Sequence, residues 1–104
     1  MDPQLKKGLL DVCILKYLSL GDSYGYKIIS DISSFVEITE STLYPILKRL
    51  EQQNCLTTHK EEHNGRIRKY YKITNQGQSK LKLFKDEYEK MLKIIEYILG
   101  GENE

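Results

Sequence analysis

Asn64 and Gly65 constrain the fold of this chain more than any other pair of residues. Both central positions of a tight type I′ turn need a positive φ, which asparagine and glycine adopt readily, and strand-like segments, "LTTHKEEH" and "RIRKYYKIT", flank the pair. Alternation along the second segment separates an apolar set, Ile67, Tyr71 and Ile73, from a basic and aromatic set, Arg66, Arg68, Tyr70 and Lys72. The sequence therefore predicts a two-stranded hairpin with one packed face and one basic face.

A first helix is predicted at the start of the chain. Asp2 followed by Pro3 is typical of a helix cap and a first-turn proline, and the apolar pattern continues until Gly21. Cys13 lies within this pattern, and Cys55 follows a later helix. We expect both cysteines to be reduced thiols rather than a disulfide, because no paired framework surrounds them.

A short second helix is expected next, capped by Asp22 or Ser23. Its apolar face is formed by Tyr24, Ile28, Ile29 and Ile32. Gly25 is a poor helix former, so its presence indicates close packing at that position.

The stretch "TESTLYPILKRLEQQN", residues 39–54, predicts a third helix. Its core face is formed by Leu43, Ile46, Leu47 and Leu50. Pro45 is unexpected there, since a proline inside a helix costs roughly 3 kcal/mol. If Thr39 or Ser41 caps the helix, Pro45 falls in the first or second turn and removes only one bond near an end.

The last predicted helix is long. Thr74 is its expected cap, and the pattern runs to about Leu99, where Gly100 and Gly101 stop it. Its apolar residues alternate at three and four positions, as in a heptad seam: Leu81, Phe84, Tyr88, Met91, Ile95 and Ile98. A helix of this length spans about 36 Å, more than a small three-helix body can cover. We therefore expect a homodimer through this helix and a frayed tail, "GENE".

Three helices followed by a hairpin is the order of elements in a winged helix-turn-helix, an α+β fold that is mainly α. The N-terminal part of the third helix is rich in hydroxyl and aromatic side chains. The second strand of the hairpin carries four basic residues within a span of seven positions: Arg66, Arg68, Lys69 and Lys72. Such a helix can read base edges in the major groove while the hairpin, which is the wing of this fold, binds phosphates. The pattern predicts a DNA-binding protein.

Three segments, "YGYKII", "STLYPILKRLEQQNCL" and "GRIRKYYKITNQGQSKL", closely resemble the PadR family of bacterial transcriptional regulators, in its short-tailed branch. The resemblance covers roughly residues 8 to 84. It implies a dimer that binds a palindromic operator, and many members are repressors relieved by a small molecule. We expect one structural domain overall, with a winged helix-turn-helix DNA-binding region at 1–74 and a C-terminal dimerisation helix and frayed tail at 75–104.

The resemblance also implies which residues contact double-stranded DNA. These are Tyr24, Ser41, Thr42, Tyr44, Lys48, Arg66, Arg68 and Lys69. Lys69 lies on the apolar parity of its strand, so the alternative for it is to pack its stem there and snorkel rather than reach DNA. A ligand in this family often lies between the terminal helices, which makes Tyr88 the preferred ring to stack on a planar effector.

Other classes of function are disfavoured by the sequence. His59 and His63 share a strand face, but no paired-cysteine spacing supports a metal site. We expect no enzymatic activity and no cofactor, because a phosphate loop, a nucleophile elbow and a convincing acid and base pair are all missing. Asp11 and Lys16 interrupt the first apolar stretch, which argues against a signal peptide or membrane span and for a cytoplasmic protein.

The alternative is a winged helix used for protein contacts, such as an adaptor or anti-repressor. Sixteen basic and fifteen acidic side chains leave a net charge of +1, which permits this interpretation. The salt dependence of binding distinguishes the DNA-binding interpretation from the protein-contact one, because phosphate binding weakens steeply as salt rises and an apolar interface does not.

Overall fold

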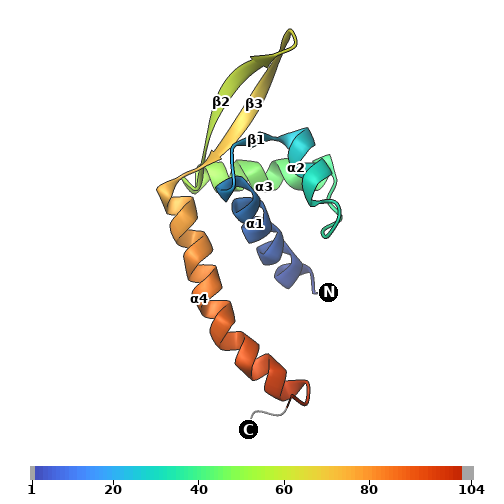
Figure 1. Cartoon of the computed structure of the whole chain (residues 1–104), viewed down its shortest axis with the longest axis vertical. Helices are drawn as coiled ribbons and strands as arrows, with labels where there is room; N and C mark the ends of the chain where they lie inside the picture. The colour runs from blue at the N-terminus through green and yellow to red at the C-terminus, as the bar shows by residue number, and fades with distance from the viewer. Residues whose placement is uncertain (1, 102–104) are drawn as a thin grey trace.

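The structure, a computed structural model, describes residues 2–101, so most of the tail that was predicted to fray lies outside the described residues. Apart from β1, which was not predicted, the elements follow the predicted order (Figure 1): α1 Pro3–Ser19, β1 Ser23–Tyr24, α2 Gly25–Ile32, α3 Glu40–Gln52, β2 Leu56–His63, β3 Arg66–Ile73 and α4 Asn75–Ile98. The chain is a winged helix-turn-helix with a long last helix, as predicted from the sequence.

The prediction that Asp22 or Ser23 caps the second helix is wrong. Ser23 and Tyr24 instead form β1, which pairs antiparallel with β3 so that Ser23 lies opposite Tyr71 and Tyr24 opposite Tyr70. Ser23 is buried, and α2 begins directly after the strand, at Gly25. The sheet therefore has three strands in the order β1-β3-β2 rather than two.

The hairpin is formed as the sequence predicts. Asn64 and Gly65 have φ values of 50° and 78°, and the two strands pair in unbroken antiparallel register from this turn to Leu56 and Ile73. Ile67 is an exception to the predicted packed face, because its side chain is 73% exposed. Strands of eight residues span about 27 Å, so the tip of the wing extends beyond the helices that bury its base (Figure 1).

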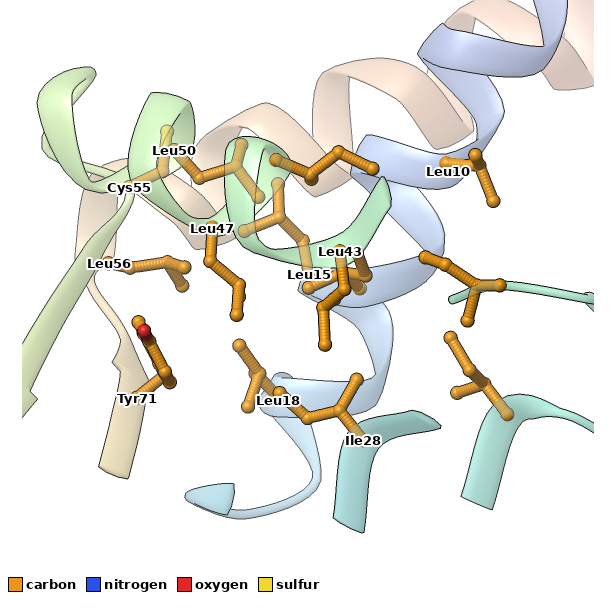
Figure 2. Packing of buried hydrophobic residues seen from close by; sticks show 14 residues of the cluster. Leu10, Leu15, Leu18, Ile28, Leu43, Leu47, Leu50, Cys55, Leu56 and Tyr71 are labelled. Atoms are coloured by element: carbon orange, nitrogen blue, oxygen red, sulfur yellow. The ribbon is translucent and has the colours of Figure 1, made fainter. Parts of the chain in front are cut away.

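The core lies where α1, α2 and α3 meet the base of the wing (Figure 2). Its fully buried side chains come from all three helices and from β2: Ile14, Leu15, Leu18, Ile28, Ile32, Leu43, Leu47, Leu50 and Leu56. Tyr71 closes the core from β3. An ion pair with 2.5 Å between Arg49 and Asp11 also joins α3 to α1. Helix α3 is thus fixed to the core by buried packing and by this ion pair.

The start of α4 is held by Thr74 and Gly77. The Thr74 hydroxyl donates to the Asn54 carbonyl at 2.6 Å and accepts from the Gly77 N–H at 3.0 Å, which confirms Thr74 as the predicted cap. The Thr74 N–H donates to the Cys55 carbonyl at 3.0 Å. A Cβ on Gly77 would lie 2.7 Å from Ile73 Cγ1 and closer still to the Cys55 carbonyl oxygen. Glycine is needed here because the backbone of another element fills the space of a side chain.

Beyond this junction, α4 extends away from the body. The wing and α4 point in opposite directions (Figure 1), and the chain measures 60 × 26 × 21 Å. Its radius of gyration is 16.0 Å, against about 13 Å for a compact chain of this length. Much of α4 therefore has little of its own chain to pack against.

Candidate nucleic-acid interface

The front of α3 carries a cluster of exposed hydroxyl groups. Thr39 is the N-cap residue, and its hydroxyl lies 2.9 Å from that of Ser41 and 3.3 Å from that of Thr42. The first backbone N–H groups of a helix have no partner within the helix and carry partial positive charge. This end of α3 can therefore exchange hydrogen bonds with base edges and phosphate oxygens.

Tyr44 and Pro45 form the next turn. Pro45 is the sixth residue of α3 counting from Glu40, so it removes one backbone bond, to the Ser41 carbonyl, within the second turn. Both side chains are exposed, Tyr44 by 46%. The proline therefore costs little, and a rigid apolar surface follows the hydroxyl cluster.

A hollow of about 530 Å³ lies between this part of α3, the start of α2 and the wing. Its lining residues are Tyr24, Gly25, Tyr26, Tyr44, Arg66, Ile67, Arg68, Lys69 and Tyr71. The structure thus brings five residues predicted to contact DNA around one concave surface: Tyr24, Tyr44, Arg66, Arg68 and Lys69. Aromatic rings and three cations line it together.

A row of rings crosses the three strands beside this hollow. Tyr24 and Tyr70 make an edge contact with 5.3 Å between centroids, and His59 stacks on Tyr70 at 5.6 Å. The Arg68 guanidinium carbon lies 4.4 Å from the Tyr24 centroid, within cation–π range. His59 Nε2 also lies 2.9 Å from a Glu61 carboxylate oxygen. Arg68 is half-buried, so its charge is held in place rather than free to move.

Lys69 lies on the other face of β3, as its parity predicts. Its ammonium nitrogen is 5.5 Å from the centroid of the Tyr71 ring, while the residue stays exposed and lines the hollow. Burial, together with charge repulsion from Tyr44 and Glu51, raises the pKa of Tyr71. Tyr71 is therefore a neutral phenol at physiological pH, and the lysine supplies the positive charge on this face.

Three predicted contact residues lie outside the hollow. Ser41, Thr42 and Lys48 are exposed along α3, which continues the same surface. Four residues of the hollow were not among the predicted DNA contacts, Gly25, Tyr26, Ile67 and Tyr71. Of these, Tyr26 and Ile67 are 73% exposed each. The sequence does carry a signal for Tyr26, since it follows Tyr24 and Gly25 in the "YGY" segment that was singled out.

A second and larger groove, about 1020 Å³, lies between α1 and α4 and reaches the turn before α3. Its apolar lining includes Leu9, Leu10, Val12, Cys13, Phe35, Val36, Leu81, Phe84, Tyr88 and Leu92. Phe84 and Tyr88 stack with 4.1 Å between ring centroids. Cys13 and Cys55 are both free thiols, and burial raises the pKa of Cys13, so a protonated, apolar sulfur faces this groove.

The predicted seam of α4 divides between the groove and solvent. Leu81, Phe84 and Tyr88 line the groove, whereas Met91 and Ile98 are 43% and 69% exposed. Apolar side chains crowd the last part of the helix, and those exposed are Met91, Leu92, Ile94, Tyr97, Ile98 and Leu99. A surface of this kind is typical of an interaction site.

Neither a metal site nor a membrane span is found within residues 2–101. Among these residues, no group of three His, Cys, Asp or Glu side chains is placed to hold a metal ion. None of the helices described is long and apolar enough to cross a membrane.

Comparison with known proteins identifies the family. The model of the transcriptional regulator PadR-like family matches residues 14–83. The chain belongs to this family. PadR-like proteins are DNA-binding transcription regulators that generally act as dimers, and they are not enzymes. The matched residues include α3 and the wing described above.

Solved structures agree with this assignment. A Streptococcus mutans UA159 protein is 40% identical, with 92% of each chain covered and a TM-score of 0.79. A transcriptional regulator from Clostridium thermocellum is 33% identical, with 93% of this chain and 96% of that chain covered and a TM-score of 0.82. A PadR family transcription regulator from Clostridium difficile R20291 is also 33% identical, with 86% and 97% covered and a TM-score of 0.81.

Proposed function

We propose that this PadR-like protein is a homodimeric repressor that reads a palindromic operator controlling its own or an adjacent operon. The observation that carries the proposal is the hollow in which Tyr44 of α3 faces Arg66, Arg68 and Lys69 of the wing. Recognition-helix groups and phosphate-binding groups share one surface there, so one DNA duplex can engage both.

The contacts divide by chemistry. Ser41, Thr42 and Tyr44 offer hydroxyl groups and a ring to base edges, and Lys48 lies one turn further along α3. On the wing, Arg66, Arg68 and Lys69 neutralise phosphates, with Tyr24 beside them. The first set supplies sequence preference, and the second supplies affinity that falls with salt.

Residues 1–74 form the DNA-binding region in this proposal, and 75–104 form the dimerisation helix and tail. Between residues 91 and 99 only Lys93 and Glu96 carry charge, and six apolar side chains are exposed. A second copy of α4 is the natural cover for such a surface. Two-fold symmetry then places the two recognition helices in successive major grooves, about 34–36 Å apart.

The groove between α1 and α4 supplies a place for an effector. Its volume, about 1020 Å³, is at the upper end of the range for small-molecule pockets, roughly 300–1,000 Å³. The stacked Phe84 and Tyr88 rings favour a planar, apolar ligand. A ligand that binds one dimer arrangement better than another shifts the spacing of the recognition helices and releases the operator.

Selection of DNA from a random pool tests the proposal without knowledge of the operator. We expect enrichment of one motif with dyad symmetry, whose half-sites lie about 10 base pairs apart or a multiple of that. A reporter gene placed behind that motif should be repressed when the protein is present. Failure to enrich any motif would instead favour a winged helix that contacts proteins, and partner capture would replace DNA selection.

A further inference from the structure

Gly25 opens α2 and is buried against the side chain of Tyr44. An added Cβ would lie 2.8 Å from Tyr44 Cζ, 3.1 Å from Cε1 and closer still to the hydroxyl oxygen. The φ of Gly25 is not in the left-handed region, so the backbone does not require glycine. Glycine is required at this position because the Tyr44 ring approaches it so closely.

The platform on which Tyr44 rests is itself held by the sheet. Ser23 and Tyr24, directly before Gly25, pair with Tyr71 and Tyr70 of β3. Tyr24 is further fixed by its ring contact with Tyr70 and by Arg68. The first turn of α2 therefore cannot easily retreat from a bulkier side chain, and an added Cβ must displace the Tyr44 ring.

The backbone of Tyr44 is equally restricted. It lies inside α3 and directly precedes Pro45, which limits its backbone further. What remains variable is the side chain, and helical residues have few allowed χ1 values. The position of the ring is thus decided by what it packs against, and Gly25 is the residue that leaves it room.

We propose that Gly25 is a positioning residue for sequence recognition: by lacking a side chain it seats the Tyr44 ring against α2 and so directs the reading surface of α3. The inference rests on the proposed DNA-reading function of that surface. It separates Gly25 and Tyr44, which act on sequence preference, from Arg66, Arg68 and Lys69, which act on affinity for any DNA.

The test compares Gly25→Ala, Tyr44→Ala, the double variant and a matched control, Gly8→Ala. Gly8 is exposed on α1, and a Cβ there meets nothing within 4 Å. We expect Gly25→Ala to lower the ratio of affinity for the selected motif over random DNA on the order of tenfold. Binding to random DNA and its salt dependence should not change, because the wing is untouched. Gly8→Ala should leave the ratio unchanged.

Interaction between the two positions is the deciding readout. Once Tyr44→Ala has removed the ring, adding Gly25→Ala should not lower the ratio further. Gly25→Ala should lower the unfolding temperature with Tyr44 present but not in the Tyr44→Ala background, where the added Cβ has room. This second measurement needs no DNA. Equal effects of Gly25→Ala in both backgrounds, or an unchanged ratio, would overturn the inference alone. A wild-type protein that binds no DNA would instead overturn the proposed function.

Discussion

The Arg68 guanidinium carbon lies 4.4 Å from the centroid of the Tyr24 ring. This contact joins the wing to the residue that precedes α2, so the two walls of the hollow are held together. It also fixes a flexible, charged side chain before any DNA arrives. Fixing it in advance reduces the entropy lost when a phosphate binds.

Substitutions of Arg68 and of Tyr24 should therefore change DNA binding in different ways. Arg68→Ala is expected to weaken binding to all sequences and to reduce the slope of log affinity against log salt by about 1, because one phosphate contact is lost. Tyr24→Leu keeps the charge but loses the ring, so the slope should stay unchanged while affinity falls about two- to fivefold. Filter binding across a salt series measures both. Wild-type affinity in Tyr24→Leu would show that the ring does not preorganise Arg68.

Two glycines should respond to alanine with opposite signs. Gly77→Ala is expected to lower the free energy of unfolding by about 2 kcal/mol or more, because its Cβ meets the Cys55 carbonyl oxygen and Ile73. Gly8→Ala should raise it by about 0.5–1 kcal/mol, since alanine favours an exposed helix. Urea unfolding at one fixed protein concentration measures both changes. Stabilisation by Gly77→Ala would contradict the close approach of α4.

The proposed dimer depends on the apolar side of α4. The pair Leu81→Glu and Ile95→Glu should produce monomers, because two charges per chain would be buried without partners. Lys90→Glu and Lys93→Glu change exposed charged positions of the same helix and serve as the control. Sedimentation equilibrium gives the mass of each. A dimer that survives both seam substitutions would exclude α4 as its interface.

Asp31 should make the stability depend on pH. Hydrogen bonds from the Tyr17 hydroxyl, at 2.5 Å, and from the Lys27 ammonium, at 3.0 Å, lower the pKa of Asp31. The folded pKa lies below the unfolded one, about 3.9, so this stabilisation is present above that pH and lost as the pH falls through the folded pKa.

Replacement of Asp31 by Asn should therefore destabilise the protein at pH 7, and the difference should shrink as the pH falls below about 3.9. Asp86→Asn, at an exposed position of α4, controls for the loss of one negative charge. Urea midpoints between pH 7 and pH 3 measure the difference. A gap between wild type and Asp31→Asn that stays constant with pH would contradict the assignment.

Several elements could be predicted because their signals are local. Asn64 and Gly65 specify a turn by their own φ preferences, and the alternation along β3 predicted that Tyr71 is buried. Pro45 could be placed in an early helical turn, since only there does its missing N–H cost little stability. Thr74 was recognised as a cap for the same reason, because its hydroxyl acts within three residues.

What the sequence did not predict depends on contacts between distant segments. A two-residue strand has no periodicity, so β1 exists only through its pairing with β3. Ile67 has the parity of a packed residue, but the wing extends past the helices and leaves it exposed. Gly25 indicated close packing, yet only the fold shows that Tyr44 is what approaches it, and that the Cys55 carbonyl approaches Gly77.

The most direct test of the central claim is binding to the DNA immediately upstream of the protein's own coding region at about 50 and 200 mM salt. The account predicts tight binding that survives excess random DNA and weakens steeply at the higher salt. The double variant Arg66→Ala and Arg68→Ala should bind every sequence more weakly, whereas Lys90→Ala with Lys93→Ala, which removes the same charge from α4, should bind as wild type. No binding at the lower salt, or undiminished binding by the wing variant, would contradict the account.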